Sequence, residues 1–150
     1  MRGLLILSLV SCLLGIGTPA EARADIAVIA HRDNPVQTMS AHELSDLYLG
    51  RSRSLGGGDR KVFVTPYEHP ADSSLRENFF RKLNGMNLKQ LNAYWARLRF
   101  SGAVLPPDTL PNSRAVIEAV GKNRAAIGYV EADSVDSSVK VLLRLPVPTD

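Results

Sequence analysis

Histidines are the residues of this sequence best suited to bind a metal ion or to move a proton near neutral pH. There are three of them, His31, His42 and His69. A zinc site needs three or four ligands that converge on one point. These histidines lie on separate predicted elements, and no two of them have the spacing of an HxH or HxxxH pair. We therefore expect no metal site.

The sequence also lacks the usual motifs of a catalytic nucleophile and of a phosphate-binding loop. There is no G-x-S-x-G elbow, and no motif places a base beside a nucleophile. The run GGGDRK at 56–61 lacks the second glycine, lysine and Ser/Thr that a phosphate loop needs at fixed spacing. It predicts a flexible, hairpin-like loop within a mobile stretch at 51–60. We expect neither an enzyme nor a bound cofactor.

The elements that position the polar residues alternate between strands and helices. Short runs rich in β-branched residues predict strands at 25–31, 61–65, 125–130 and 139–145, the second closed by Pro66. Apolar residues three and four apart, with caps before them and glycines after them, predict helices between these strands. The first helix is expected from Ser40 to Gly50, with a capping box at Ser40-x-x-Glu43. The second is expected to end at Gly85, the third to run from Asn87 to Gly102, and the fourth to begin with a cap at Asn112 or Ser113. This order predicts an α/β sandwich, with a mostly parallel or mixed sheet flanked by helices.

Three aromatic residues on the third predicted helix need a separate interpretation. Tyr94, Trp95 and Phe100 follow the same helical spacing as Leu91 and Leu98. That spacing predicts a place in the core rather than a platform on which a ligand stacks.

Residues 1–24 have the pattern of an export signal. A basic start precedes an uncharged apolar run over 4–16, and an A-x-A cleavage site follows at 22–24. The run is shorter than the about 20 residues that span a bilayer, which disfavours a membrane anchor. A second interpretation is a lipoprotein that carries its lipid on Cys12. We expect a single periplasmic or secreted domain over 25–150, with no membrane span after cleavage.

The composition is that of an ordinary globular domain. The 150 residues carry 18 Lys and Arg against 15 Asp and Glu, a formal net charge of +3, without a block of like charges. This balance argues against a protein dedicated to nucleic acids or to membrane surfaces. Cys12 is the single cysteine, so the chain after the expected cleavage has no disulfide and no thiolate metal site.

Five short motifs carry a resemblance to a known family. In chain order they are Tyr48-Leu49-Gly50, Arg76-x-x-Phe79, Tyr94-Trp95-x-x-Leu98-x-Phe100-Ser101-Gly102, Pro106-Pro107 and Ala126-Ile127-Gly128-Tyr129-Val130. In this order and spacing they resemble the phosphate ABC transporter substrate-binding protein family, especially its small secreted members. The resemblance runs from about 26 to 130. It implies the type II periplasmic-binding-protein fold, of which this chain is expected to form a single lobe.

The resemblance also implies an anion site. Full-length members hold phosphate in this lobe with an arginine followed four residues later by Ser-Gly-Thr at a helix N-terminus, where free N–H groups and the helix dipole favour an anion. Aligned on Phe79, His69 takes the arginine position, Ser73 is retained, and Ser74 replaces the glycine. Arg76, one step into the helix, offers a nearby charge. The ligand-binding residues so implied are Ser73, Ser74, Arg76 and His69.

Each of these residues also has a structural interpretation. Ser74-x-x-Glu77 is a capping box, which occupies the hydroxyl with the helix backbone but leaves other N–H groups free. His69 stands in the polar turn 67–72, where a solvated side chain is expected, and it replaces the missing arginine only if protonated at mildly acid pH. Arg76 is common in the family, so it also fits a purely structural role.

Two functions follow from the sequence. The first is an exported solute-binding-like module that recognises phosphate or a related oxyanion. A single lobe leaves half of the anion in water, so we expect weak binding by a monomer and tight binding only with a homodimer or an envelope protein partner. The alternative is an envelope protein–protein interaction or regulatory module that has lost ligand binding and uses the loops at 51–60 and 101–111. Ser73, Ser74 and Arg76 support the first, and the missing Arg and Gly-Thr support the second.

Overall fold

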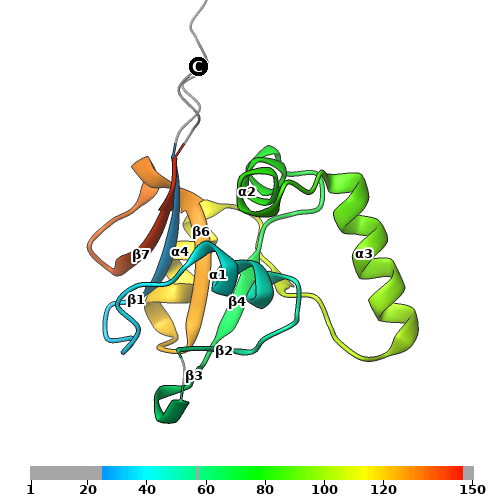
Figure 1. The fold of residues 1–150 in the computed structure, drawn as a ribbon. Coiled ribbons are helices and arrows are strands. Elements are labelled where there is room, and N and C mark those ends of the chain that lie inside the picture. The colour runs from blue at the N-terminus through cyan, green and yellow to red at the C-terminus, as the bar shows by residue number, and fades with distance from the viewer. Residues whose placement is uncertain (1–24, 57, 147–150) are drawn as a thin grey trace, which may run out of the picture.

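The computed structural model of the chain describes residues 25–56 and 58–146 (Figure 1). The predicted export signal at 1–24, including the alternative lipid site at Cys12, lies outside these residues. Among the helices of the described part, none has both the length and the apolar character that crossing a membrane requires.

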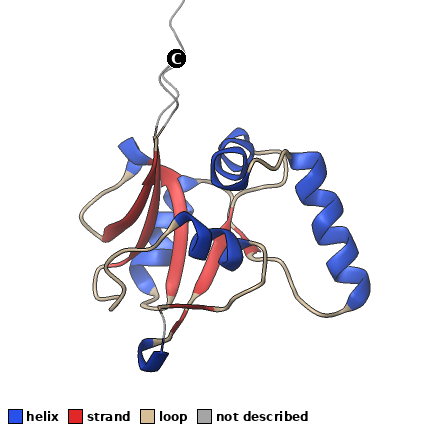
Figure 2. Ribbon diagram, viewed as in Figure 1, coloured by secondary structure: helices blue, strands red, loops and turns tan. Residues whose placement is uncertain are grey.

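A mixed sheet lies at the centre of the domain (Figure 2). Within the described residues its strands are β1 (Ile26–His31), β4 (Thr65–Glu68), β5 (Asp108–Thr109), β6 (Ala126–Glu131) and β7 (Val139–Leu145), in the order β5-β4-β6-β1-β7. β4 pairs in parallel with β5 and β6, whereas β1 pairs antiparallel with β6 and β7. β1 alone of these five therefore opposes the common direction, and the predicted mostly parallel, mixed sheet is confirmed.

β1 shows why the sheet is covered on both faces. Its residues from Ile26 to Ala30 are all apolar and buried. Because side chains alternate along a strand, Val28 and Ala30 join the apolar cluster on one face, while Ala27 and Ile29 join the cluster on the other. A continuous apolar run of this kind is typical of a strand that is buried on both sides.

Helices form the two outer layers (Figure 1). α1 (Ala41–Tyr48), α2 (Ser74–Asn84) and α3 (Leu88–Ser101) supply apolar side chains to one cluster, and α4 (Ser113–Lys122) supplies them to the other. The predicted α/β sandwich is thus confirmed, with the larger core on the side of α1 to α3.

The helix boundaries follow the predicted capping residues. Ser40 begins α1 with the predicted capping box, Asn87 begins α3 with a second one, and Asn112 begins α4. Gly85 and Gly102 follow α2 and α3 with φ angles of 75° and 67°. Glycine adopts this left-handed conformation without a steric penalty, which explains why these helices end there.

The predicted strand at 61–65 is divided between two sheets. β3 (Val62–Phe63) pairs antiparallel with β2 (Ser54–Leu55) in a separate ribbon, and β4 begins only at Thr65. The predicted hairpin is confirmed by this ribbon, which also contains the short 3-10 helix η1 (Gly58–Arg60). A second 3-10 helix, η2 (Ala132–Ser134), follows β6.

Pro66 does not close a strand, as predicted, but lies inside β4. The N–H of Thr65 donates to the Ala125 carbonyl oxygen, toward β6, so the nitrogen of Pro66 faces the opposite side. On that side β5 pairs only with Tyr67 and Glu68, so no ladder hydrogen bond is lost at Pro66. The prediction failed because it treated a proline as incompatible with the interior of a strand.

Candidate functional site

A pocket of about 310 Å³ lies where the carboxyl ends of β4 and β5 meet the start of α2 and one side of α3. Ligands of α/β proteins usually bind beyond the carboxyl ends of parallel strands. The polar and charged side chains that line this pocket are Glu68, His69, Arg76, Asn92, Arg99 and Thr109.

A buried ion pair forms one wall of the pocket. Arg76 Nε lies 3.4 Å from Glu68 Oε2, and the two side chains are only 7% and 5% exposed. Among the described residues, neither of these two atoms has a hydrogen-bond partner. Arg76 Nη1 donates to Asn92 Oδ1 at 3.3 Å, and the guanidinium carbon lies 5.7 Å from the centre of the Phe80 ring. The arginine that the family resemblance implies for the anion therefore already has an internal carboxylate beside it.

The other oxygen of Glu68 is held by two donors. Oε1 accepts hydrogen bonds from the backbone N–H of His69 at 2.9 Å and from the Tyr129 hydroxyl. Burial raises the pKa of Glu68, while the hydrogen bond from Tyr129 and the charge of Arg76 oppose that rise. Burial also raises the pKa of Tyr129 well above its usual value, and the neighbouring Glu68 charge adds to this, so its hydroxyl remains a donor.

His69 is 3% exposed, so the prediction of a solvated side chain was wrong. Its Nε2 lies 2.8 Å from the Tyr129 carbonyl oxygen, and its ring centre lies 4.8 Å from the Tyr129 ring. Because a carbonyl can only accept, Nε2 carries the proton of the neutral ring. Burial lowers the pKa of His69, which favours this neutral form. The prediction failed because the turn after β4 directs position 69 against β6 rather than into solvent.

Ser73 and Ser74 lie at the start of α2, outside the residues that line the pocket. Ser73 is the cap of the helix, and its Oγ accepts from the backbone N–H of Arg76 at 3.3 Å. Ser74 is the first helical residue and is exposed, so the predicted capping box at Ser74-x-x-Glu77 was wrong. The cap lies one residue earlier, and the residue three positions after it is Arg76, whose side chain cannot accept a hydrogen bond in return. Glu77 instead pairs with Arg81 at 2.5 Å. The structure thus brings Arg76 and His69 together and places both serines at the helix end.

Sequence reasoning missed the residues that complete the pocket. Glu68 stands at the carboxyl end of β4, a usual place for functional side chains, but the predicted strand ended three residues too early to reveal it. Asn92 and Arg99 are seven residues apart on α3, which is two turns, so they share one helix face. That spacing is a sequence signal that could have identified both residues.

The aromatic residues of α3 divide between core and surface. Trp95 is buried, and Tyr94 is half-buried with its hydroxyl donating to the Leu49 carbonyl oxygen at 2.6 Å. Both agree with the predicted core. Phe100 is 94% exposed, so the same prediction was wrong for it. It is two residues after Leu98, about 200° further around the helix, so it lies on the face opposite to Leu91 and Leu98, which contact the cluster.

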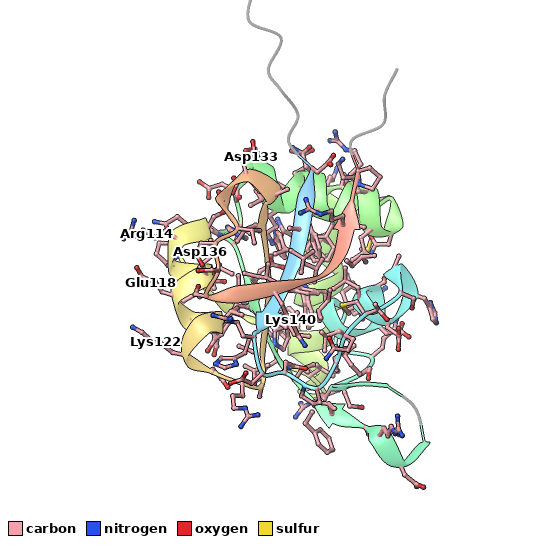
Figure 3. All side chains as sticks on the ribbon, turned by 90° about the vertical axis from the view of Figure 1, so that its left-hand side faces the viewer. Arg114, Glu118, Lys122, Asp133, Asp136 and Lys140 are labelled. Carbon is pink, nitrogen blue, oxygen red and sulfur yellow. The ribbon has the colours of Figure 1, made fainter. Side chains whose placement is uncertain are left out.

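The outer face of α4 carries charged side chains (Figure 3). They do not form a buried cluster like the one in the pocket of Glu68 and Arg76. Arg114, Glu118 and Lys122 follow each other at four-residue spacing on this helix, and Arg114 Nε lies 3.3 Å from Glu118 Oε1. Both of these side chains are exposed, and exposed pairs of this kind contribute little to stability. Within residues 25–56 and 58–146, no group of three or more His, Cys, Asp or Glu side chains is arranged to hold a metal ion.

Solved structures with a similar fold identify the fold class of the chain. No family model and no curated protein sequence matches the chain. A Clostridium perfringens structure described as a candidate phosphate ABC transporter substrate-binding protein with bound phosphate matches with a TM-score of 0.61 and 23% identity, over 79% of this chain and 45% of that one. An ABC-type phosphate transport receptor from Vibrio cholerae matches with a TM-score of 0.58 and 21% identity, over 79% and 46%. A candidate phosphate-binding protein from Planctomyces limnophilus has a TM-score of 0.58 and 15% identity, over 79% and 41%.

These likenesses confirm the predicted fold class. The described residues have the fold of one lobe of a type II periplasmic-binding protein. The chain spans less than half of the length of the solved structures that it matches. The pocket, which combines two arginines with a buried carboxylate, lies within this shared fold.

Proposed function

We propose that this chain is a non-catalytic, solute-binding-like module that binds phosphate or a related small oxyanion in the pocket between β4, α2 and α3. The observation that carries the proposal is that Arg76 and Arg99 line one pocket beside the N-terminus of α2. Guanidinium groups and a helix N-terminus both favour anions. The likeness in fold to proteins described as phosphate receptors supports the same ligand class.

The lining residues have different roles in this proposal. Arg99 is exposed on α3 and offers the accessible positive charge, whereas Arg76 is buried and offers the deeper one. The Asn92 amide and the Thr109 hydroxyl are neutral groups that can donate to an oxyanion. His69 is held neutral and contributes shape rather than charge. Ser73 and Ser74 act through the first turn of α2, whose dipole points its positive end toward an anion.

Binding by the described residues alone is expected to be weak. Ligand sites usually bury most of the ligand, and a single lobe supplies only one wall of such a site. A millimolar Kd corresponds to about 4 kcal/mol of binding free energy. Tight binding would need a second surface, supplied by another copy of the chain or by an envelope protein. A periplasmic or secreted location is part of the proposal and is supported by the sequence pattern of residues 1–24.

Calorimetric titration of the purified protein with phosphate, sulfate, arsenate and molybdate tests this function. We expect at least one anion to bind with a Kd of about 1 mM. Arg99→Gln should weaken that binding about tenfold, because it removes the accessible charge. Arg97→Gln is the matched control, since Arg97 is exposed on the same helix but does not line the pocket. If no anion binds at millimolar concentration, or if both variants weaken binding equally, the proposal is wrong.

A further inference from the structure

The pocket contains two buried polar atoms whose hydrogen-bonding capacity is unused. Glu68 Oε2 and Arg76 Nε lie 3.4 Å apart, and neither makes a hydrogen bond among the described residues. Both side chains are more than nine-tenths buried and both line the pocket. Buried polar groups are normally satisfied, and these two atoms face each other with almost no accessible surface, so a further polar group can reach them when the pair separates.

An anion that approaches this pair is attracted by one of its members and repelled by the other. Arg76 attracts it, but the ionised Glu68 carboxylate already occupies the same guanidinium and repels a second anion at close range. The other groups that face Glu68 are Tyr129 from β6, Tyr48 from α1 and His69 beside it, and all three are neutral in the forms favoured by burial. Arg76 from α2 is thus the cation that faces Glu68, with Arg99 of α3 elsewhere in the lining.

We propose, on the basis of the proposed oxyanion function, that Glu68 is an internal competitor for Arg76 and that the pocket takes up an oxyanion together with one proton. The proton comes from solvent and binds to Glu68 Oε2, which then changes from an acceptor into a donor. Arg76 Nε–H and the new Glu68 O–H both become donors to the anion, so the two unused positions are filled at once. Release of the anion returns the proton to solvent and restores the ion pair.

Two features of the site favour this coupling. Burial raises the pKa of Glu68, so its neutral form is easier to reach than that of an exposed glutamate. The Oε1 atom keeps its hydrogen bonds from the His69 backbone and the Tyr129 hydroxyl, so the carboxyl group stays in position while Oε2 changes its role. Binding then becomes stronger as the pH falls, because the competing carboxylate is neutralised.

Sulfate is the best probe because its own charge does not change between about pH 5 and pH 8, the range in which a histidine or a buried glutamate can titrate. We expect the affinity of the wild-type protein for sulfate to rise about tenfold or more between these limits. Calorimetry at the upper pH in two buffers of different ionisation enthalpy should show uptake of close to one proton per sulfate. This measurement uses the wild-type protein and needs no variant. Absence of proton uptake, with equal sulfate affinity at both pH values, would overturn the role of Glu68 and leave the anion-binding function intact.

Glu68→Gln tests the assignment to this residue. Glutamine keeps an acceptor for the His69 backbone and the Tyr129 hydroxyl but cannot compete as an anion. The variant should bind sulfate at the upper pH about as well as the wild type does at the lower pH, with little pH dependence. If the variant retains the wild-type pH dependence, another group, such as His69, titrates and the inference is wrong.

Removing Glu68 alone leaves a buried arginine without its partner, which can destabilise the fold. A double variant, Glu68→Gln with Arg76→Met, removes both charges and serves as the folded control. It should bind sulfate at least about tenfold more weakly than the wild type at the lower pH, and with no pH dependence. Sulfate binding by this double variant at the wild-type level would place the anion elsewhere. If neither the wild type nor Glu68→Gln binds sulfate or phosphate at either pH, the proposed function fails together with this inference.

Discussion

Gly128 of β6 lies directly against Val116 of α4. A Cβ atom built on Gly128 would lie 2.4 Å from the Val116 Cγ1 atom, closer than real side chains approach. Val120 lies slightly farther away, with its Cγ2 atom 3.4 Å from the same position. The absence of a side chain at residue 128 therefore lets α4 pack closely on the sheet, in the smaller of the two cores.

Gly128→Ala should destabilise the protein because the added methyl group has no space. Overpacking of this kind typically lowers the free energy of unfolding by about 1–3 kcal/mol. Chemical denaturation of the wild type and the variant measures the difference. Val116→Ala provides space for the new methyl group, so the double variant should be less destabilised than the sum of the two single variants. Strict additivity of the two effects would contradict the proposed contact.

Truncation of two phenylalanines on adjacent helices should change the free energy of unfolding by very different amounts. Phe79 of α2 is fully buried, and its ring stacks on that of Tyr129 with centres 3.7 Å apart. Phe100 of α3 is 94% exposed. Phe79→Ala should lower the free energy of unfolding by about 3–5 kcal/mol. Phe100→Ser should change it by less than about 0.5 kcal/mol, and a larger loss in a urea titration would show that Phe100 is buried in solution.

Local signals account for most of what the sequence could predict. Ser40, Asn87 and Asn112 each cap a helix with their own side chain, and Gly85 and Gly102 end helices through their own backbone freedom. These preferences depend on a few neighbouring residues, so they can be recognised without the fold. The buried strands could be predicted equally well, because a continuous apolar run can be recognised in the sequence without knowing which strands pair with it.

The site could be predicted only in part because its contacts are between distant residues. Arg76 was identified through the resemblance, but its partner Asn92 is 16 residues away, and the Tyr129 that holds Glu68 is 61 residues away. No local pattern indicates that these side chains meet. The burial of His69 has the same cause, since it depends on the packing of the turn against β6. A polar turn gives the same sequence signal whether it faces solvent or another strand.

Ser73 and Ser74 should differ in their contribution to stability, although they are adjacent and chemically identical. Ser73→Ala removes the cap of α2 and should lower the free energy of unfolding by about 1 kcal/mol. Ser74→Ala, at the exposed first helical position, should change it by less than about 0.5 kcal/mol. Denaturant titration of both variants under one condition makes the comparison. An equal loss in the two variants would contradict the assignment of Ser73 as the cap.

His69 should make the stability of the protein depend on pH. Burial lowers its pKa below the usual 6.5, so the folded protein binds fewer protons than the unfolded chain at pH values just below 6.5. The contribution of the neutral imidazole is therefore fully present above about pH 6.5 and is lost as the pH falls toward the lowered pKa. Glu68 acts in the opposite direction, because its raised pKa means that its contribution falls as the pH rises above its usual 4.5.

The effect of His69 can be separated from that of Glu68 by comparison with His69→Gln, which keeps Glu68 and a donor for the Tyr129 carbonyl oxygen. The wild type should exceed this variant in free energy of unfolding by a larger margin at about pH 7.5 than at about pH 5, because only the wild type must keep an imidazole neutral as the pH falls. Urea titrations of both proteins at the two pH values give this margin directly. A margin that is equal at both pH values, or larger at the lower one, would show that His69 is protonated as readily in the folded protein as in the unfolded chain.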